Sequence, residues 1–220
     1  MPTRRAVLFD LDGTLIDSKV QHISSWKELF ERHGYPVSEA DVVRSFGQTS
    51  RHIVRSMLAG QCDETQVTAM ADEKEAIYRE LIRDELELLP GAPELLDALR
   101  KADYRIALAT SAPPENVSMV LHELRIGPLF DEVVGEQDIS RSKPDPEIFL
   151  LAAERLNVAP CRCVVFEDSP SGVKAAIAAE MHCVAVTTGY SRHDLPGADL
   201  WIDDFRSIDV ATITALTDTP

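Results

Sequence analysis

The stretch AVLFDLDGTLIDS, residues Ala6–Ser18, joins an apolar run to two aspartates and a turn. Consecutive apolar residues without alternation are typical of a strand that is buried on both faces, as in a parallel sheet. Asp10 and Asp12 follow this run, and Gly13 comes next. A polar turn at a strand end is the ordinary explanation, because aspartate and glycine are common turn residues. Whether the two carboxylates have a chemical role depends on what other strand ends supply.

Three further segments share the design of the first run. They are RIALA at 105–109, CVVF at 163–166 and CVAV at 183–186. Helical patterns lie at 92–102, 114–124, 145–156 and 171–180, and residues 200–216 are typical of a last strand and a closing helix. Strands that alternate with helices predict an α/β fold with a Rossmann-like, doubly wound parallel sheet.

A helical segment interrupts this alternation after the first strand. No run between about residues 18 and 88 predicts a buried strand, whereas amphipathic periodicity predicts helices. The helical stretches are 20–34, 38–46, 50–60 and 64–85. Pro90 and Gly91 form a turn that marks the return to the alternating pattern. We therefore expect an α/β core domain of residues 1–17 and 88–220, with an inserted small helical domain of residues 18–87.

The composition is that of a globular protein with an acidic surface. Of the 220 residues, 45% are hydrophobic, which is enough for a sizeable core. The net charge of −15 argues against nucleic acids and anionic membranes as partners, because both would repel this surface. No apolar segment approaches the roughly 20 residues that span a bilayer, and we expect no signal peptide. The pattern is compatible with a monomer or a small homo-oligomer.

The four cysteines fit neither a disulfide framework nor a zinc site. Cys161 and Cys163 are separated by one residue, and the sequence has no matching second pair. We expect reduced thiols in a cytoplasmic protein, with Cys163 and Cys183 in buried strands.

Polar residues stand at the ends of three predicted strands, namely Asp10, Thr110 and Asp168. The carboxyl ends of parallel strands form the ligand-binding edge of such a sheet. An aspartate there can attack phosphorus if positive charge offsets the repulsion between two anions. Asp10 and Asp168 together suit Mg²⁺, which binds through a few carboxylates, substrate phosphate and water. Lys143 precedes Pro144 in an extended or turn segment, from which its ammonium can reach the same edge.

Two more features of these strand ends suit phosphate chemistry. Thr110 and Ser111 precede a predicted helix, and their hydroxyls and backbone N–H groups can bind phosphate oxygens. Asp12 lies on the same side as Asp10 if the extended geometry continues. It is therefore a candidate general acid and base, which protonates a leaving alcohol and then activates water.

The motifs DLDGT, TS, SKPDP and ED, in this order, resemble the four motifs of the haloacid dehalogenase superfamily, subfamily I, in its phosphatase and phosphomutase branch. The resemblance covers nearly the whole chain, and it implies that the helical insertion is the small cap of this family. It further implies that Asp10 forms an aspartyl phosphate and that Asp12 is the general acid and base. Thr110 or Ser111, together with Lys143, would hold the phosphoryl group.

The same resemblance implies Mg²⁺ as the cofactor. Its ligands would be Asp10, the backbone carbonyl of Asp12, Asp168 and Glu167, the last directly or through water. Dehalogenases and phosphonate hydrolases of the superfamily lack the second aspartate, so Asp12 favours chemistry on phosphate esters.

The insertion is most similar to the cap of β-phosphoglucomutase and its phosphatase relatives. His22 and Trp26, one helical turn apart, and Lys74 match cap residues that face the substrate in that branch. GQTSR, residues Gly47–Arg51, resembles the cap loop that reads the substrate, with one extra residue before Arg51. Structural alternatives remain open: Trp26 as core of the bundle, His22 as a partly buried histidine, and Lys74 as part of a solvated charged face.

Two prolines favour hydrolysis over phosphoryl transfer within one substrate. In the mutase a lysine and an asparagine that hold a second phosphate follow the TS-type motif, whereas this chain has Pro113 and Pro114 there. Neither proline can donate a hydrogen bond. We therefore expect a Mg²⁺-dependent phosphatase that acts on a small phosphorylated sugar or polyol. The alternatives are a β-phosphoglucomutase-like phosphomutase and a protein that binds a phosphorylated metabolite without turnover.

Overall fold

A six-stranded parallel sheet forms the centre of the protein, whose computed structural model describes residues 4–218. The strand order is β3-β2-β1-β4-β5-β6, which places the strand before Asp10 in the middle. The strands are β1 (Ala6–Phe9), β2 (Arg105–Ala109), β3 (Glu132–Val134), β4 (Cys163–Glu167), β5 (His182–Val186) and β6 (Leu200–Ile202). The predicted strands are confirmed. Residues 1–3 and 219–220, which the predicted core domain includes, lie outside the described residues.

One strand was absent from the prediction. β3 has three residues, EVV, and pairs with β2 at one edge of the sheet. Three residues are too few to show a hydrophobic period, so the sequence pattern gave no signal for this strand.

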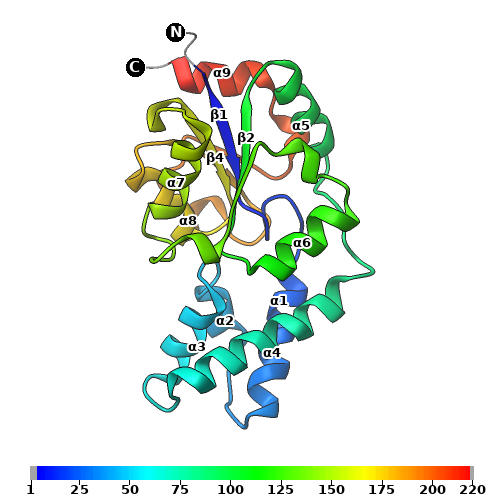
Figure 1. Ribbon diagram of the computed structural model, residues 1–220, viewed down its shortest axis with the longest axis vertical. Coiled ribbons are helices and arrows are strands. Elements are labelled where there is room, and N and C mark those ends of the chain that lie inside the picture. The colour runs from blue at the N-terminus through cyan, green and yellow to red at the C-terminus, as the bar shows by residue number, and fades with distance from the viewer. Residues whose placement is uncertain (1–3, 219–220) are drawn as a thin grey trace.

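Helices cover both faces of the sheet, as a doubly wound fold requires (Figure 1). They are α5 (Ala92–Lys101), α6 (Pro114–Glu123), α7 (Glu147–Leu156), α8 (Pro170–Ala178) and α9 (Val210–Asp218). Val7 and Phe9 of β1 face a core that includes side chains of α5, α6 and α9, and Ala6 and Leu8 face the core of α7 and α8. Because both faces of β1 are buried, every one of its residues is apolar.

The helical insertion lies at the carboxyl edge of the sheet, and both described chain ends lie at the opposite edge (Figure 1). Its helices are α1 (Lys19–Arg32), α2 (Glu39–Arg44), α3 (Ser50–Leu58) and α4 (Glu64–Ile82). They enclose an apolar cluster of their own, which includes Trp26 and Phe30. The chain is thus an α/β core with an inserted small helical cap, and the exact domain limits stay a prediction.

Aromatic packing fixes the register that positions the candidate aspartates. Phe9 of β1 stacks on Phe166 of β4, with ring centroids 4.9 Å apart, and Phe205 packs on both rings. The two strands pair with Phe9 opposite Phe166, and the backbone N–H of Asp10 donates to the carbonyl of Phe166 at 3.0 Å. Glu167 and Asp168 come directly after Phe166, so this pairing places them beside Asp10.

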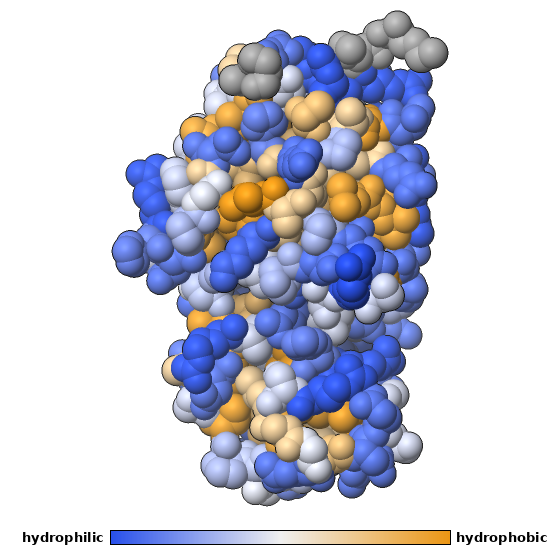
Figure 2. All heavy atoms as spheres, turned by 90° about the vertical axis from the view of Figure 1, so that its left-hand side faces the viewer, coloured by the Kyte–Doolittle hydropathy of each residue, from blue (hydrophilic) through white to orange (hydrophobic). Residues whose placement is uncertain are grey.

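The outer surface has no continuous apolar patch on the face shown in Figure 2, where hydrophobic residues form small separate groups among hydrophilic ones. Among the described residues, the large hydrophobic side chains that are exposed lie on four different helices: Val20, Leu81, Leu150 and Ile177. No helix between residues 4 and 218 has the length and apolarity that a membrane crossing needs.

We expect Phe166→Ala to lower the free energy of unfolding by about 3–5 kcal/mol, because it leaves a cavity between two aromatic rings. Urea denaturation followed by circular dichroism measures this change. Leu150→Ala on α7, where the side chain is 39% exposed, is the control and should change the free energy of unfolding by about 0.5 kcal/mol or less. Equal losses for the two variants would contradict the packing described.

Candidate active site

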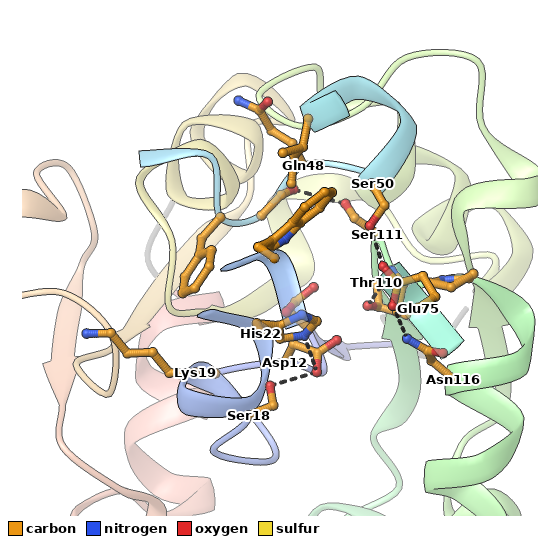
Figure 3. Close-up of a pocket in the computed structure, with 18 of the residues that line it drawn as sticks. Asp12, Ser18, Lys19, His22, Gln48, Ser50, Glu75, Thr110, Ser111 and Asn116 are labelled. Carbon is orange, nitrogen blue, oxygen red and sulfur yellow. Dashed lines mark hydrogen bonds and ion pairs between the residues drawn. The ribbon is translucent and has the colours of Figure 1, made fainter. Parts of the chain in front are cut away.

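A pocket lies between the carboxyl edge of the sheet and the cap (Figure 3). Its walls come from the turn after β1, the segment after β2, helices α1 and α4, and the cap segment 46–50. Among the predicted site residues, those that line it are Asp10, Asp12, His22, Trp26, Gly47, Lys74, Thr110, Ser111 and Asp168. Lys143 and Glu167 do not line the pocket. Lys143 contacts the side chains of both Asp10 and Glu167.

Asp10 shares a buried lysine with Glu167. The ammonium of Lys143 lies 2.6 Å from Asp10 Oδ1 and 2.6 Å from Glu167 Oε1. Burial opposes the charge of Lys143, but the two carboxylates outweigh burial and raise its pKa, so that the lysine stays charged. Burial also raises the pKa of Asp10 to about 7, although Lys143 opposes that shift.

Asp168 completes a cluster of three buried carboxylates. Burial, together with the negative charges of Glu167 and Asp10, raises the pKa of Asp168 well above its usual range. Its Oδ1 accepts a long hydrogen bond of 3.5 Å from Thr14 Oγ1. Gly13, with φ of +80°, passes so close that a Cβ there would lie 2.1 Å from Asp168 Oδ2. Only glycine fits this turn, because it tolerates positive φ and has no side chain.

The charge of this cluster fits a divalent cation. One ammonium does not neutralise three carboxylates, and burial together with the neighbouring negative charges raises the pKa values of Asp10 and Asp168. Between residues 4 and 218, no group of three or more His, Cys, Asp or Glu side chains is arranged as a metal cage. Mg²⁺ does not need one, because it binds through one or two carboxylates and keeps several waters. Asp10 and Asp168 therefore fit Mg²⁺ better than a metal that demands several side-chain ligands.

Glu167 has less free ligand capacity than the two aspartates. Its Oε1 accepts from Lys143, and its Oε2 accepts from the backbone N–H of Ser169 at 2.8 Å and from the Ser169 hydroxyl at 3.0 Å. A Cβ on Gly172 would lie 1.8 Å from the Glu167 carboxyl carbon, so the side chain is tightly enclosed. Its role as a metal ligand stays a prediction, and these contacts favour a role through water.

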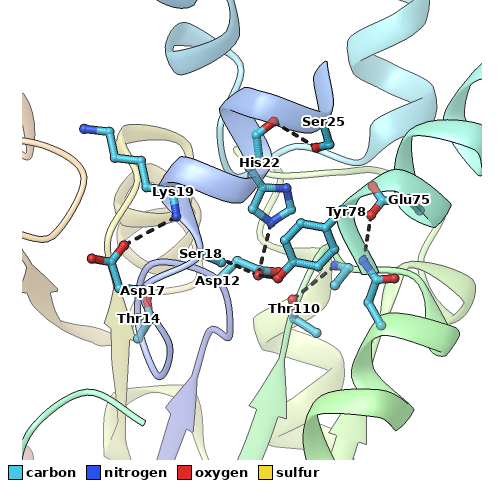
Figure 4. A network of polar contacts seen from close by, with 12 residues as sticks. Asp12, Thr14, Asp17, Ser18, Lys19, His22, Ser25, Glu75, Tyr78 and Thr110 are labelled. Carbon is cyan, nitrogen blue, oxygen red and sulfur yellow. Dashed lines mark hydrogen bonds and ion pairs between the residues drawn. The ribbon is translucent and has the colours of Figure 1, made fainter. Parts of the chain in front are cut away.

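Asp12 accepts three hydrogen bonds, mostly from the cap (Figure 4). Its Oδ1 lies 2.7 Å from Ser18 Oγ, 2.7 Å from the hydroxyl of Tyr78 and 3.1 Å from His22 Nε2. Burial alone would raise the pKa of Asp12, but His22, Tyr78 and Ser18 together hold it well below its usual range. Burial and Asp12 raise the pKa of Tyr78 well above its usual range. The phenol therefore stays protonated and donates a hydrogen bond to Asp12.

His22 connects Asp12 to a buried lysine of the cap. Its ring stacks on Tyr78 with centroids 4.0 Å apart, and its Nδ1 lies 2.7 Å from Lys74 Nζ. Lys74 is 1% exposed, which excludes the solvated charged face that its sequence neighbours allowed. Trp26 both packs in the cap core and lines the pocket, so its structural and functional interpretations are compatible.

The TS motif meets the cap at Gly47. Thr110 is buried and its Oγ1 accepts from the backbone N–H of Ala112 at 3.1 Å, whereas Ser111 Oγ donates to the Gly47 carbonyl at 3.0 Å. Gly47 has φ of +84°, and a Cβ there would lie 2.3 Å from Ser169 Oγ. Cap and core thus approach each other so closely that a side chain at Gly47 would separate them.

Arg51 lies outside this pocket. It lines a neighbouring groove, where its guanidinium is 3.7 Å from Asp72 and 3.6 Å from Glu136. Ser50, the first residue of α3, lines the pocket instead. Successive helix residues point about 100° apart, so the extra residue before Arg51 turns it away. Its role in binding substrate stays a prediction that this position does not support.

Three residues at or beside the pocket had no motif in the sequence: Tyr78, which contacts Asp12, and Glu75 and Asn116, which line the pocket. Tyr78 was visible only as the residue four positions after Lys74, which places both on one helix face. Glu75 accepts from Lys74 at 2.9 Å and from Asn116 at 2.6 Å. Glu75 and Asn116 are 41 positions apart in the sequence, so nothing in the local pattern predicts that they meet.

Comparison with known proteins places this site in context. The family model for haloacid dehalogenase-like hydrolases matches residues 4–180. A validoxylamine A 7'-phosphate phosphatase from Streptomyces hygroscopicus subsp. limoneus is 34% identical over 205 residues, which cover 93% of this chain and 95% of that protein. A phosphoglycolate phosphatase from Pseudomonas putida is 34% identical over 212 residues, 93% of this chain and 78% of that protein. The crystal structure of a β-phosphoglucomutase from Clostridium difficile matches with a TM-score of 0.89 and 28% identity, over 98% of this chain and 97% of that one.

The raised pKa of Asp10 predicts a pH-dependent stability difference between the wild type and Asp10→Asn in metal-free buffer. The folded state holds the proton up to about pH 7, whereas an ordinary aspartate loses it near pH 3.8. Stability from this group is therefore fully present below about pH 4 and lost as the pH rises to about 7. We expect the free energy of unfolding of the wild type, relative to Asp10→Asn, to fall by on the order of 1–4 kcal/mol over this range.

Urea denaturation in EDTA at several pH values measures this difference. The asparagine is the matched control, because it has the shape of aspartate and no charge. A difference that stays constant from pH 4 to 7.5 would contradict the raised pKa.

Proposed function

Because the chain belongs to the haloacid dehalogenase-like hydrolase family, as a phosphoric monoester hydrolase, we propose that it hydrolyses small phosphorylated sugars or polyols through an aspartyl phosphate on Asp10. The observation that carries this proposal is that two carboxylates, one residue apart, have different hydrogen-bonding partners. Asp10 is held by a buried lysine, and Asp12, two residues on, is held by donors from the cap. Such a pair divides the roles of nucleophile and general acid and base.

In the first half of the reaction, an Asp10 carboxylate oxygen attacks phosphorus and the bond to the ester oxygen breaks. Asp12 gives its proton to the departing alkoxide. This proton is replaced in the second half, when Asp12 takes one from the attacking water, and His22 Nε2, 3.1 Å from Asp12 Oδ1, holds the carboxyl group in place. Lys143 stays charged beside Asp10 and offsets the repulsion between the carboxylate and the phosphate.

In the second half, the Asp12 carboxylate takes a proton from water and the water oxygen attacks the phosphorus of the aspartyl phosphate. The bond to Asp10 breaks, which regenerates the carboxylate and releases inorganic phosphate. The low pKa of Asp12 supports this step, because it favours the carboxylate form that accepts the proton. The hydrogen bond from Ser111 Oγ to the Gly47 carbonyl joins core and cap at the edge of the pocket.

Mg²⁺ is the proposed cofactor, held by Asp10, Asp168 and the backbone carbonyl of Asp12, and with Glu167 acting through water. When bound, it neutralises the negative charge of the phosphoryl oxygens and of the carboxylate cluster. Thr110 and Ser111, through their hydroxyls and the backbone N–H groups that follow β2, are proposed to bind the phosphoryl oxygens.

The similarity to a β-phosphoglucomutase makes isomerisation the second candidate. A mutase must hold a second phosphate while its intermediate turns round. Pro113 lines the pocket where a donor would be needed, and Pro114 begins α6. Neither offers a hydrogen-bond donor. Hydrolysis is therefore favoured, and a binding protein without turnover would have no use for the paired aspartates.

The proposed substrate and the four free thiols favour a reducing compartment such as the cytoplasm. Cys163 and Cys183 lie buried in strands β4 and β5, as the sequence indicated.

Release of inorganic phosphate from a panel of sugar phosphates, polyol phosphates, phosphoglycolate and nucleotides, with Mg²⁺, tests the proposed function. Hexose 1-phosphates are followed in parallel for isomerisation in the presence of a bisphosphate activator. We expect phosphate release from sugar or polyol phosphates, and loss of activity in EDTA that added Mg²⁺ restores. Isomerisation without phosphate release would establish a mutase instead.

Two variants test the roles of the aspartates. Asp10→Asn should lower kcat by at least about 1,000-fold, because it removes the nucleophile. Asp12→Asn should lower kcat by about 100-fold or more and slow the hydrolysis of the aspartyl phosphate, because the base is lost. Rapid quenching and mass spectrometry should then show a phosphate adduct on Asp10 in Asp12→Asn and none in Asp10→Asn. An adduct on another residue would rule out this mechanism.

A further inference from the structure

A buried carboxylate of the cap stands on the pocket wall and has no role in the proposed reaction. Glu75 of α4 is 6% exposed and lines the pocket. Its Oε1 accepts from Lys74 Nζ at 2.9 Å and from the hydroxyl of Ser50, and its Oε2 accepts from Asn116 Nδ2 at 2.6 Å. Burial opposes the charge of Glu75, but Lys74, His22 and Ser50 lower its pKa below the usual value, so the carboxylate is ionised.

The orientation of Asn116 is set by a second contact. Arg79 Nη1 donates to Asn116 Oδ1 at 2.8 Å, which turns the amide N–H₂ towards Glu75. Asn116 belongs to α6 of the core, and Glu75 and Arg79 belong to α4 of the cap. The Glu75 carboxylate is thus held in place from both parts of the protein (Figure 3).

Glu75 neutralises Lys74, the buried cation on the cap side of the pocket. Lys74 is buried against the rings of Trp26 and Tyr78, with its ammonium 5.2 and 5.0 Å from their centroids. Its contacts with polar groups are Glu75 Oε1 and His22 Nδ1. Its charge therefore remains paired within the protein.

The other cationic side chains that line the pocket do not offset this arrangement. Among the described residues that line the pocket, Lys19 and His22 are the remaining ones that can carry positive charge. Lys19 extends away from the pocket on the side opposite Glu75 and donates to the Gly189 carbonyl at 2.9 Å (Figure 3). His22 is engaged by Asp12 and Lys74, and Arg51 lies in the neighbouring groove between two acidic residues.

On the basis of the proposed function, we infer that Glu75 determines specificity: the enzyme hydrolyses monoesters whose remaining part is uncharged or cationic, and it discriminates against a second anionic group. A carboxylate or second phosphate near α4 would meet the negative charge of Glu75 in a pocket of low dielectric, where repulsion is strong. A hydroxyl or ammonium group can instead donate to Glu75, since a carboxylate offers about four acceptor positions and three donors occupy it here.

Two substrates of equal length separate these cases. Glucitol 6-phosphate ends in a neutral CH₂OH group, and 6-phosphogluconate ends in a carboxylate. We expect kcat/KM for glucitol 6-phosphate to exceed that for 6-phosphogluconate by about tenfold or more, the size of one uncompensated charge interaction in such a site. The shorter pair 2-hydroxyethyl phosphate and phosphoglycolate should show the same order.

Variants of Glu75 assign the selectivity to this residue. Glu75→Gln keeps a hydrogen-bonding side chain of the same length but removes its charge and leaves Lys74 uncompensated, so the ratio should fall by about tenfold. Glu75→Asp keeps the charge and should keep the preference for the neutral substrate. Glu73→Gln is the matched control, because Glu73 lies on the same helix and pairs with Arg32 and His33 at the outer surface.

These experiments distinguish a wrong role for Glu75 from a wrong proposed function. No phosphate release from any of the four esters, nor from the wider panel, would refute the phosphatase itself. Release from 6-phosphogluconate at equal or greater kcat/KM, or an unchanged ratio in a folded Glu75→Gln, would overturn the role of Glu75 alone. Circular dichroism checks the fold of each variant. If Glu75→Gln does not fold, the two wild-type ratios decide, and ratios near one overturn the proposal.

Discussion

The burial of three carboxylates beside one lysine is the constraint on which the candidate active site depends. Asp10, Glu167 and Asp168 stand at adjacent ends of β1 and β4, and Lys143 reaches two of them from the segment before α7. An ion cluster of this kind is stable only if its charges are balanced, because desolvation of each ion is costly. The fold therefore holds Asp10, the proposed nucleophile, in a cluster that an additional cation would stabilise, and the apolar packing of Phe9 on Phe166 keeps the two strand ends in register.

Asp12 extends this constraint from the core to the cap. Its hydrogen-bond donors are Ser18, His22 and Tyr78, all from the chain beyond β1, whereas Asp10 is held by core residues alone. The protonation of Asp12 therefore depends on where α1 and α4 lie. Two aspartates separated by one residue can thus have different pKa values, because each belongs to a different part of the structure.

Features that depend on residues close together in the sequence were predictable, whereas features that depend on contacts between cap and core were not. β1, β2, β4 and β5 were predictable because burial on both faces leaves continuous apolar runs, and Asp10, Asp12 and Asp168 because each follows or ends such a run. Lys74 could be placed on a helix but not assigned to solvent or interior, since its neighbours Asp72 and Glu73 are polar. The contact of Glu75 with Asn116 and the position of Arg51 depend on how the cap closes on the core, and no local period encodes that closure.

The pairing of both buried lysines limits the positive charge that this acidic chain offers to a phosphate ester. Lys143 is shared by Asp10 and Glu167, and Lys74 is paired with Glu75, so neither leaves free positive charge in the pocket. With a net charge of −15, the surface does not attract the substrate either. Attraction must then come from groups next to the transferring phosphoryl, namely the proposed Mg²⁺ and the backbone N–H groups after β2. The charge on the phosphoryl group changes in the transition state. Attraction concentrated on this group therefore stabilises the transition state more than the bound substrate.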